Sequence, residues 1–371
     1  MVQLDENILL VIVMWFDKKH LIKHNSILLK DLHGYVLPHA GTEHSGEIIS
    51  HTLRFKPRKN FTRIIILYYP SQKEPNVDGK YYHEFYVPWK SLDFFINEKW
   101  NLNKDIDILG INLQNLSVNL SFIDMKNTLI VVSADFSHFL PMDQAIELEN
   151  KASHSMQHRE LDMSEYNRVV DDIISFEQLY RIIPDKYVLQ WVGRTRSKGE
   201  KGVGYLSFLI RDPADPNKEI PNGMFVTAYD KQMNARECLG EWFDDKKYSI
   251  NIENNLVQKV LTLGKKTSRL TGGRNKQIPI TNYTITYLYK SNKPFIRGWH
   301  GVKYNSFFLP DVFLENTYNS GKWIQKNDKL WDLDDKFDMK ETLDKLTMKS
   351  GGNRSKIDYI LYSSNVIHHK I

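Results

Sequence analysis

Two histidines in the first half of the chain each follow an apolar run. His39 lies in Leu37–Gly41 (LPHAG), and His138 ends Ser133–His138 (SADFSH). If the apolar runs are strands, both imidazoles lie in loops at strand ends, where α/β domains place their sites. Neutral imidazole is the commonest metal ligand, and a nearby carboxylate orients its other nitrogen. The pattern predicts a metal site with His39 and His138 as ligands and Asp135 as a catalytic carboxylate.

A second interpretation of the same motifs involves no metal. Catalytic metal sites have about three protein ligands, and only two are evident here. In this interpretation His39 caps a turn and His138 helps to begin the following helix. The residue types alone leave both interpretations open.

The chain has a single cysteine, Cys238. A thiolate is a nucleophile when cations, a helix N-terminus or a base lower its pKa. Arg236 would favour the thiolate, whereas the neighbouring Glu237 would oppose it. Cys238 is therefore either a catalytic nucleophile or a small buried hydrophobe. One cysteine also excludes an intramolecular disulfide, so we expect an intracellular, cytoplasmic protein.

Four other histidines and a basic cluster receive no site role. His154 and His158 have helical i, i+4 spacing without the glutamate of a zinc-protease motif, and we expect them on a helix surface. His368 and His369 lie near the C-terminus, where we expect fraying. The basic residues between 265 and 276 are typical of a solvated loop after a helix.

Composition bounds the class of protein. The 371 residues are 41% hydrophobic and 26% charged, which suits a globular chain of two domains. The net charge of +5 is small, and its signs are interspersed, which argues against nucleic acid as a partner. The apolar run at 8–16 is too short to span a bilayer, so we expect no membrane association.

Apolar runs and helical spacing outline an α/β first half and an α+β second half. Three prolines within 213–221 fix φ and remove amide donors, which favours a linker there. We therefore predict domains at 1–212 and 222–371. The expected strands lie at 8–16, 62–69, 129–133, 203–210, 224–229 and 283–289, and the expected helices at 46–53, 142–158, 255–263 and 337–348.

The first half resembles the Memo family. Leu37–Gly41, followed by Ser45-Gly46, is similar to the family's Pro-His-Ala-Gly…Ser-Gly motif. Val131–His138 is similar to its Ser-Ser-Asp-Phe/Leu-x-His motif, and Leu189–Ile210 to its final strand pair. Tyr82–Trp89 is similar to a segment between the two histidine motifs.

This resemblance covers about residues 30 to 212. It implies a layered α/β/α domain with a central, mostly parallel or mixed sheet, similar to the extradiol dioxygenases that use non-haem iron. In the family this pocket carries histidine and cysteine ligands for iron or copper. His39 and His138 match two of those positions.

The chain departs from the family at two ligand positions. Tyr69–Lys73 (YPSQK) stands where the family has Gly-Pro-x-His-His, so Gln72 or Lys73 replaces a ligand histidine. The family cysteine should fall near 169–172, and none is there. His83 and Glu84 are candidate replacements, because two histidines and one carboxylate form a set that suits iron.

The second half resembles the AMMECR family over about residues 220 to 367. Asn222–Thr227 (NGMFVT) and Ala235–Gly240 (ARECLG) are similar to its Gly-x-Phe-Val-Thr and Leu-Arg-Gly-Cys-Ile-Gly motifs. Gly301–Val312 is similar to its Gly…Phe-Leu-Pro-x-Val segment. The resemblance implies an AMMECR-like α+β domain.

Three functions remain open at this point. In the first, the chain is a metal-binding, redox-type enzyme with iron or copper at His39 and His138. Alternatively it is a pseudoenzyme without a cofactor, a scaffold that binds a protein, peptide or small-molecule ligand. A third alternative is that the AMMECR-like half acts through Cys238. Fold alone does not choose among them.

Overall fold

A computed structural model gives the fold of the chain. It describes all residues except 1–14, 23, 59–60, 71–81, 103–104, 115–119, 121–122, 161–165, 198–200, 214–218, 244–247, 267–277, 305, 316–342, 345 and 349–358. Most of the predicted strand at 8–16, the helix at 337–348 and the linker at 213–221 therefore lie outside the described residues. So do Gln72 and Lys73, and the replacement of a ligand histidine there stays a prediction.

The described chain forms two compact units, whose main boundary falls between Asp212 and Pro213. The residues Ser153–Glu160 belong to the second unit. Within the described part, no helix is both long and apolar enough to cross a membrane.

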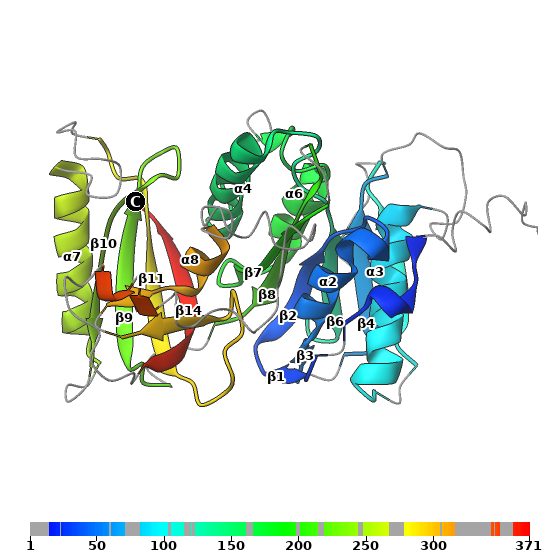
Figure 1. The fold of residues 1–371 in the computed structure, drawn as a ribbon, viewed down its shortest axis with the longest axis horizontal. Helices are drawn as coiled ribbons and strands as arrows, with labels where there is room; N and C mark the ends of the chain where they lie inside the picture. The colour runs from blue at the N-terminus through cyan, green and yellow to red at the C-terminus, as the bar shows by residue number, and fades with distance from the viewer. Residues whose placement is uncertain are drawn as a thin grey trace, which may run out of the picture. The chain divides into compact units, whose positions relative to one another are not determined.

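Figure 1 labels the helices and strands of the first unit except β5. The elements of this unit are β1 (Ile27–Leu29), β2 (Leu32–Leu37), α2 (Thr42–Leu53), β3 (Phe55–Pro57), β4 (Arg63–Tyr68), α3 (His83–Phe94), β5 (Asp107–Asn112), β6 (Thr128–Ser133), α4 (Met142–Gln157, whose last turn lies in the second unit), α6 (Ile173–Ile182), β7 (Val188–Arg196) and β8 (Gly204–Arg211).

The first unit is built on a six-stranded sheet of order β5-β4-β6-β2-β8-β7. The first four strands are parallel, and β8 and β7 are antiparallel additions. β6 is buried along its whole length, and β4 along all but its first residue, as continuous apolar runs predict. The general α/β class is therefore confirmed, and the expected strands at 62–69, 129–133 and 203–210 are β4, β6 and β8.

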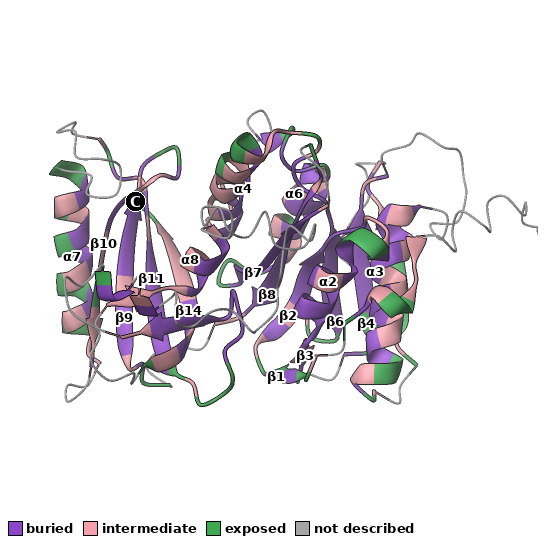
Figure 2. Cartoon of the chain, viewed as in Figure 1, coloured by how far each residue is buried: buried purple, intermediate pink, exposed green. Residues whose placement is uncertain are grey.

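Helices cover both faces of this sheet. The Thr52 hydroxyl of α2 is hydrogen-bonded to the Ser207 hydroxyl of β8 over 2.6 Å. Phe208 points to the opposite face because successive strand residues alternate. There it contacts Phe136, which contacts Phe176 of α6. The strands between these helices are largely buried, as Figure 2 shows.

A buried charge network holds the loop that follows β6. Glu149 of α4 bonds Nη2 of Arg194 over 2.6 Å and lies 3.7 Å from Nη1 of Arg196, and all three side chains are fully buried. Ser137, in the loop, donates to Glu149 and accepts from Arg196. Gly204 is required beside it, because a Cβ there would lie 1.9 Å from the Glu149 carboxylate. The network therefore fixes the segment between Asp135 and His138.

The second unit contains β9 (Gly223–Tyr229), β10 (Ala235–Trp242), α7 (Ile250–Lys266), β11 (Asn282–Lys290), β12 (His300–Lys303), β13 (Phe307–Phe308), α8 (Pro310–Glu315) and β14 (Ile360–Lys370). Its sheet has the order β10-β9-β11-β14-β12-β13, with every pairing antiparallel. The predicted strands at 224–229 and 283–289 are β9 and β11. The predicted helix at 255–263 is α7, which is longer at both ends.

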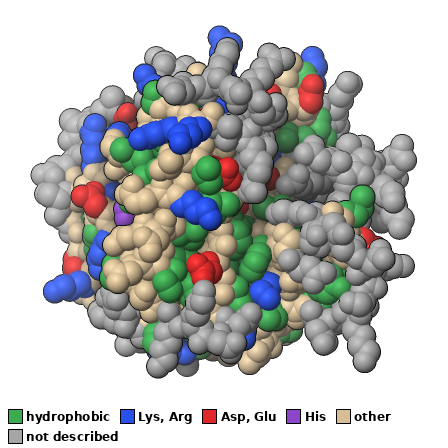
Figure 3. All heavy atoms as spheres, turned by 90° about the vertical axis from the view of Figure 1, so that its left-hand side faces the viewer, with side chains coloured by type: hydrophobic (Ala, Val, Ile, Leu, Met, Phe, Trp, Pro, Cys, Tyr) green, Lys and Arg blue, Asp and Glu red, His purple; other side chains and the backbone are tan. Residues whose placement is uncertain are grey.

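One face of this second sheet packs on α7. Val257 and Val260 of the helix join Val226, Ile285 and Tyr287 of the strands in one apolar cluster. The outer side of α7 carries basic and acidic side chains among apolar ones, as Figure 3 shows from this side. The opposite face of the sheet carries polar residues such as Thr227 and Thr284, and also aromatic ones such as Phe225, which contacts Phe307.

The expected positions of four histidines are wrong. His154 has a side chain only 16% exposed, because its segment packs against Tyr229 within the second unit. His158 also contacts Tyr229 and is half-buried. His368 and His369 lie in β14, where they pair with Thr284 and Tyr283 of β11.

We predict that Glu149→Gln destabilises the protein by about 3–5 kcal/mol, because two buried guanidinium groups lose their counter-charge. Lys151→Gln on the same helix is the control. Its ion pair with Glu147 is solvent-exposed, so the change should stay within about 0.5 kcal/mol. Urea unfolding of both variants measures the difference, and equal midpoints would contradict the role given to the network.

Candidate metal centre

The loops that carry His39 and Asp135 leave the sheet side by side. β2 and β6 are parallel neighbours in which Leu37 pairs with Ser133. The amide of Ala134 donates to the carbonyl of Leu37, one step beyond the strand ends. The amide of His39 then donates to Oδ1 of Asp135 over 2.9 Å. Two parallel strands thus bring an imidazole and a carboxylate together at their carboxyl ends.

Ser133 determines which nitrogen of His39 carries a hydrogen. The Ser133 hydroxyl donates to the Glu84 carbonyl over 2.5 Å, so its oxygen is left to accept. Nδ1 of His39 lies 3.0 Å from that oxygen and is therefore a donor. Nε2 is the nitrogen that meets the carboxylates.

Two aspartates face Nε2 of His39. Oδ2 of Asp171 lies 3.0 Å from it, and Oδ2 of Asp135 lies 3.7 Å from it. The other oxygen of Asp171 accepts the Asp135 amide over 2.9 Å. The side chain of Asp171 is 26% exposed, whereas those of His39 and Asp135 are buried. Asp171 is therefore the member of the group that solvent reaches.

Asp171 is the residue that the sequence analysis missed. It lies within 169–172, where the Memo resemblance places a cysteine. The next residue, Asp172, is the N-cap of α6 and accepts the amides of Ser175 and Tyr69. A helix start needs only one capping carboxylate. Two adjacent aspartates before one helix were therefore the signal that Asp171 has another role.

His83 and Glu84 approach His39 from the start of α3. Nδ1 of His83 lies 3.3 Å from Oε2 of the buried Glu84, and the rings of His39 and His83 meet edge to face with centroids 5.1 Å apart. One donor atom each from His39, His83 and Glu84 lies within 4.8 Å of the others, and the same holds for His39, Asp135 and Asp171. Among the described residues, only these sets of three meet that spacing.

His138 lies nearby but belongs to neither set of donors. Its Nδ1 lies 2.6 Å from the Phe136 carbonyl, so Nδ1 is the donor and Nε2 is free to bind a ligand. A strand-like pairing with Val203 fixes its backbone. A positive charge on its ring would lower the pKa of His83 and of Asp135. Its role as a ligand therefore stays a prediction.

The charges around His39 favour a cation at Nε2. Burial alone would lower the pKa of His39, but Asp135, Asp171 and Glu84 raise it from 6.5 to about 10. Burial and the charge on His39 lower the pKa of His83. Burial raises the pKa of Asp135 against the opposing effect of His39. Nε2 therefore holds a proton at neutral pH unless another positive charge takes its place.

Cys238 lies in the second unit, on strand β10 rather than in a loop. Its sulfur accepts from the Thr227 hydroxyl over 3.2 Å, and its amide donates to Oε1 of Glu237 over 3.0 Å. The side chain is half-buried. The neighbours of Cys238 are thus a hydroxyl and a carboxylate. The role of Cys238 as a nucleophile stays a prediction.

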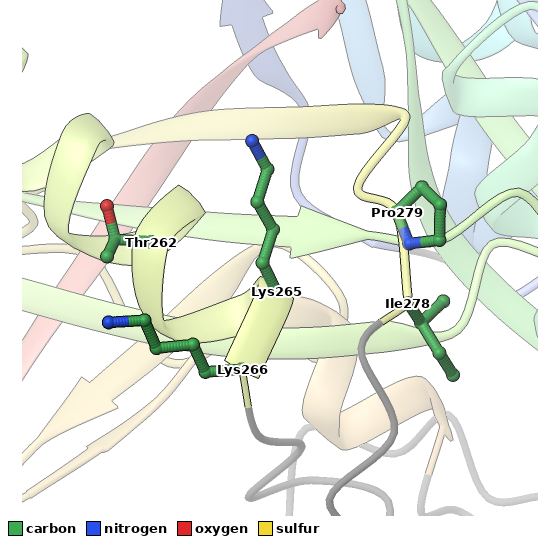
Figure 4. A pocket seen from close by; sticks show the side chains of 5 residues that line it. All are labelled: Thr262, Lys265, Lys266, Ile278 and Pro279. Carbon is green, nitrogen blue, oxygen red and sulfur yellow. The ribbon is translucent and has the colours of Figure 1, made fainter.

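The basic cluster begins in a helix and not in a loop. Lys265 and Lys266 form the last turn of α7, and the cluster's other members lie outside the described residues. A groove of about 450 Å³ lies there, and Figure 4 shows the two lysine side chains extending in different directions. Its lining is Thr262, Lys265, Lys266, Ile278 and Pro279.

Comparison with known proteins names no relative. No family model matches the chain. A search of curated proteins also finds no match. The geometry of the site therefore carries the functional argument.

We predict that the metal-free protein loses stability between about pH 6.5 and pH 10. The folded-state pKa of His39 is raised, so its contribution is complete below the unfolded pKa and disappears as pH rises through the folded one. The loss is on the order of a few kcal/mol. Urea unfolding at several pH values measures it, and a His39→Asn variant should lack this fall. If the stability of the wild type and that of His39→Asn change with pH in the same way, the raised pKa is wrongly assigned to His39.

Proposed function

We propose that the first unit binds a divalent metal ion of the non-haem iron kind through His39, His83 and Glu84, and that the protein is a redox-type enzyme. The observation that carries this proposal is the surroundings of the Nε2 atom of His39. Ser133 sets the tautomer of the His39 ring, and Nε2 of that ring is buried and faces a group of carboxylates. Such an arrangement needs a positive charge.

The donor types favour iron over copper. Two imidazoles and one carboxylate are the set used by non-haem iron oxygenases. Asp135 and Asp171 add further carboxylate oxygens around the same nitrogen, and the chain supplies no thiolate here. Soft ligands, which select copper(I), are therefore missing from the described donors. A bound iron ion would supply redox chemistry.

The surrounding residues have positioning roles in this proposal. Ser133 orients His39 from the side away from the carboxylates. Asp171 is the partly exposed carboxylate, so it is the group best placed to accept a proton from a substrate arriving from solvent. Asp135 is buried, and its carboxylate holds the His39 loop by accepting a hydrogen bond from the backbone amide of His39.

The family assignments remain part of the proposal. We propose that residues 1–212 form a Memo-like α/β/α domain and residues 222–371 an AMMECR-like α+β domain. The mixed sheet with helices on both faces supports the first, and the motif order supports both. The boundary of the compact units after Asp212 agrees with this division.

One observation favours a second candidate function, a catalytically silent ligand-binding module. Asp135, Asp171 and Glu84 raise the pKa of His39 to about 10 even though burial opposes this. A proton on Nε2 would then satisfy these carboxylates as an internal ion pair. The two candidates differ in whether a metal displaces that proton.

We predict that the natively purified protein contains iron, and that His39→Asn lowers its metal affinity by more than about tenfold. Loss of an outer ligand-orienting group already costs about 10–100-fold, and His39 is a direct ligand. Asp171→Asn should weaken binding less. His44→Asn, an exposed histidine of α2, is the matched control.

Elemental analysis and a metal titration of the four proteins measure this. Equal metal content in the wild type and in His39→Asn would contradict the metal proposal and leave the silent module.

A further inference from the structure

Four aromatic side chains gather on the face of the second sheet that turns away from α7. Trp242 of β10 and Phe307 of β13 have ring centroids 6.0 Å apart, and Phe225 of β9 meets Phe307 edge to face at 5.0 Å. Tyr362 of β14 lies 6.3 Å from both Trp242 and Phe307. Tyr362 is buried, whereas the other three are half-buried. We call these four residues the aromatic cluster, and all of them belong to the second unit.

Glycines opposite two of these rings let the rings lie along the sheet. Gly240 pairs with Phe225, and Gly223 pairs with Trp242. A Cβ at Gly240 would collide with the Phe225 ring, and a Cβ at Gly223 would lie 2.8 Å from Cε3 of Trp242. Each ring therefore crosses the neighbouring strand and turns one π-face away from the sheet. An aromatic face presented in this way can stack with a planar ring of a ligand.

Two lysines reach the same indole from different strands. Nζ of Lys303 on β12 lies 5.3 Å from the centroid of the Trp242 ring, and Nζ of Lys290 on β11 lies 5.7 Å from it. Lys290 pairs with Tyr362 and Lys303 pairs with Phe307, so the sheet register places both lysines on the face of the cluster. Two positive charges thus meet at one aromatic ring.

No described carboxylate balances these two charges. Among the described residues, neither Lys290 nor Lys303 is ion-paired with an acid. Glu241 precedes Trp242 in sequence, but it pairs with Met224 of the α7 cluster and so lies on the other face. The two ammonium groups are therefore complementary to a ligand that carries negative charge.

The indole N–H of Trp242 also lacks an acceptor. Its Nε1 is buried and has no hydrogen-bond partner. A buried indole N–H usually has one, because leaving a donor unpaired is unfavourable. A ligand that brings an oxygen acceptor to this ring would satisfy Nε1.

We propose that the aromatic cluster binds a nucleoside phosphate, with the base stacked on Trp242 and the phosphate held by Lys290 and Lys303. Stacking on an aromatic face is open to every base, and lysine binds phosphate as a point charge. The rings alone would also suit a cation, but the two lysines repel one. This site needs no metal ion at His39, so it does not rest on the function proposed for the first unit.

The charge favours a single nucleotide over a nucleic-acid strand. Proteins that bind single strands follow the backbone with a positively charged groove. Here two of the described lysines contact one ring, which suits one base and one phosphate. The small net charge of +5 agrees with this choice.

Calorimetric titration of the full chain with AMP tests this, with adenosine and inorganic phosphate as partial ligands. The wild type should bind one AMP, and each partial ligand should bind more than about tenfold more weakly, because one of the two contacts is missing. Trp242→Leu should weaken AMP binding by about 5–150-fold, because base stacking is lost. Lys290→Gln and Lys303→Gln should each weaken AMP binding about tenfold and leave adenosine binding unchanged.

Trp89→Leu and Lys259→Gln are the matched controls. Trp89 of α3 also has a lysine over its ring, Lys90 at 4.3 Å, but it lies in the first unit. Lys259 is an exposed residue of α7, on the other side of the second sheet. Both variants should bind AMP as the wild type does.

Three outcomes would overturn the proposal even if Trp242→Leu fails to fold. The first is a wild-type chain that does not bind AMP or binds phosphate as tightly as AMP, since the base would then contribute nothing. The second is AMP binding that Lys290→Gln and Lys303→Gln both leave unchanged. The third is a single-stranded oligonucleotide that binds more than about tenfold tighter than AMP and depends on the same lysines, because the ligand would then be a strand.

Discussion

The first unit is organised around one unbalanced charge. Nε2 of His39 points at Asp135 and Asp171 in a place where the imidazole and Asp135 are buried. A buried carboxylate such as that of Asp135 is costly unless a positive charge lies beside it. A proton or a metal ion on Nε2 satisfies this requirement. The loops that carry His39, Asp135 and Asp171 are hydrogen-bonded to one another around that position.

The scaffold enforces this arrangement from two directions. The parallel pairing of β2 with β6 places the two loops at the same level, and Ser133 turns the His39 ring so that Nε2 faces the acids. Below the second loop, the buried Glu149 network holds Ser137. A site of long-range contacts is thereby built on rigid strands and a helix, which hold its donors close together.

Local patterns predicted the strands well, because burial on both faces leaves an unmistakable apolar run, as in β4 and β6. The loop positions of His39 and Asp135 followed from those strands. Asp171 could not be found this way, because it reaches Asp135 across 36 residues of chain. His158 and His368 were misplaced for the same reason: only tertiary pairing brings a helix end and the last strand together. Hydrophobic periodicity indicates which face of a helix or strand is buried, but not which other element packs against that face.

The central claim is that a metal ion replaces the proton on Nε2 of His39. Nitrogen NMR of histidine-labelled protein, without metal and with one equivalent of Zn²⁺ as a diamagnetic substitute for iron, tests it most directly. We expect a protonated Nε2 in the metal-free protein at pH 7, and a metal-bound Nε2 with Nδ1 still protonated after Zn²⁺ is added. A His39 ring whose Nε2 keeps its proton with Zn²⁺ present would contradict the account.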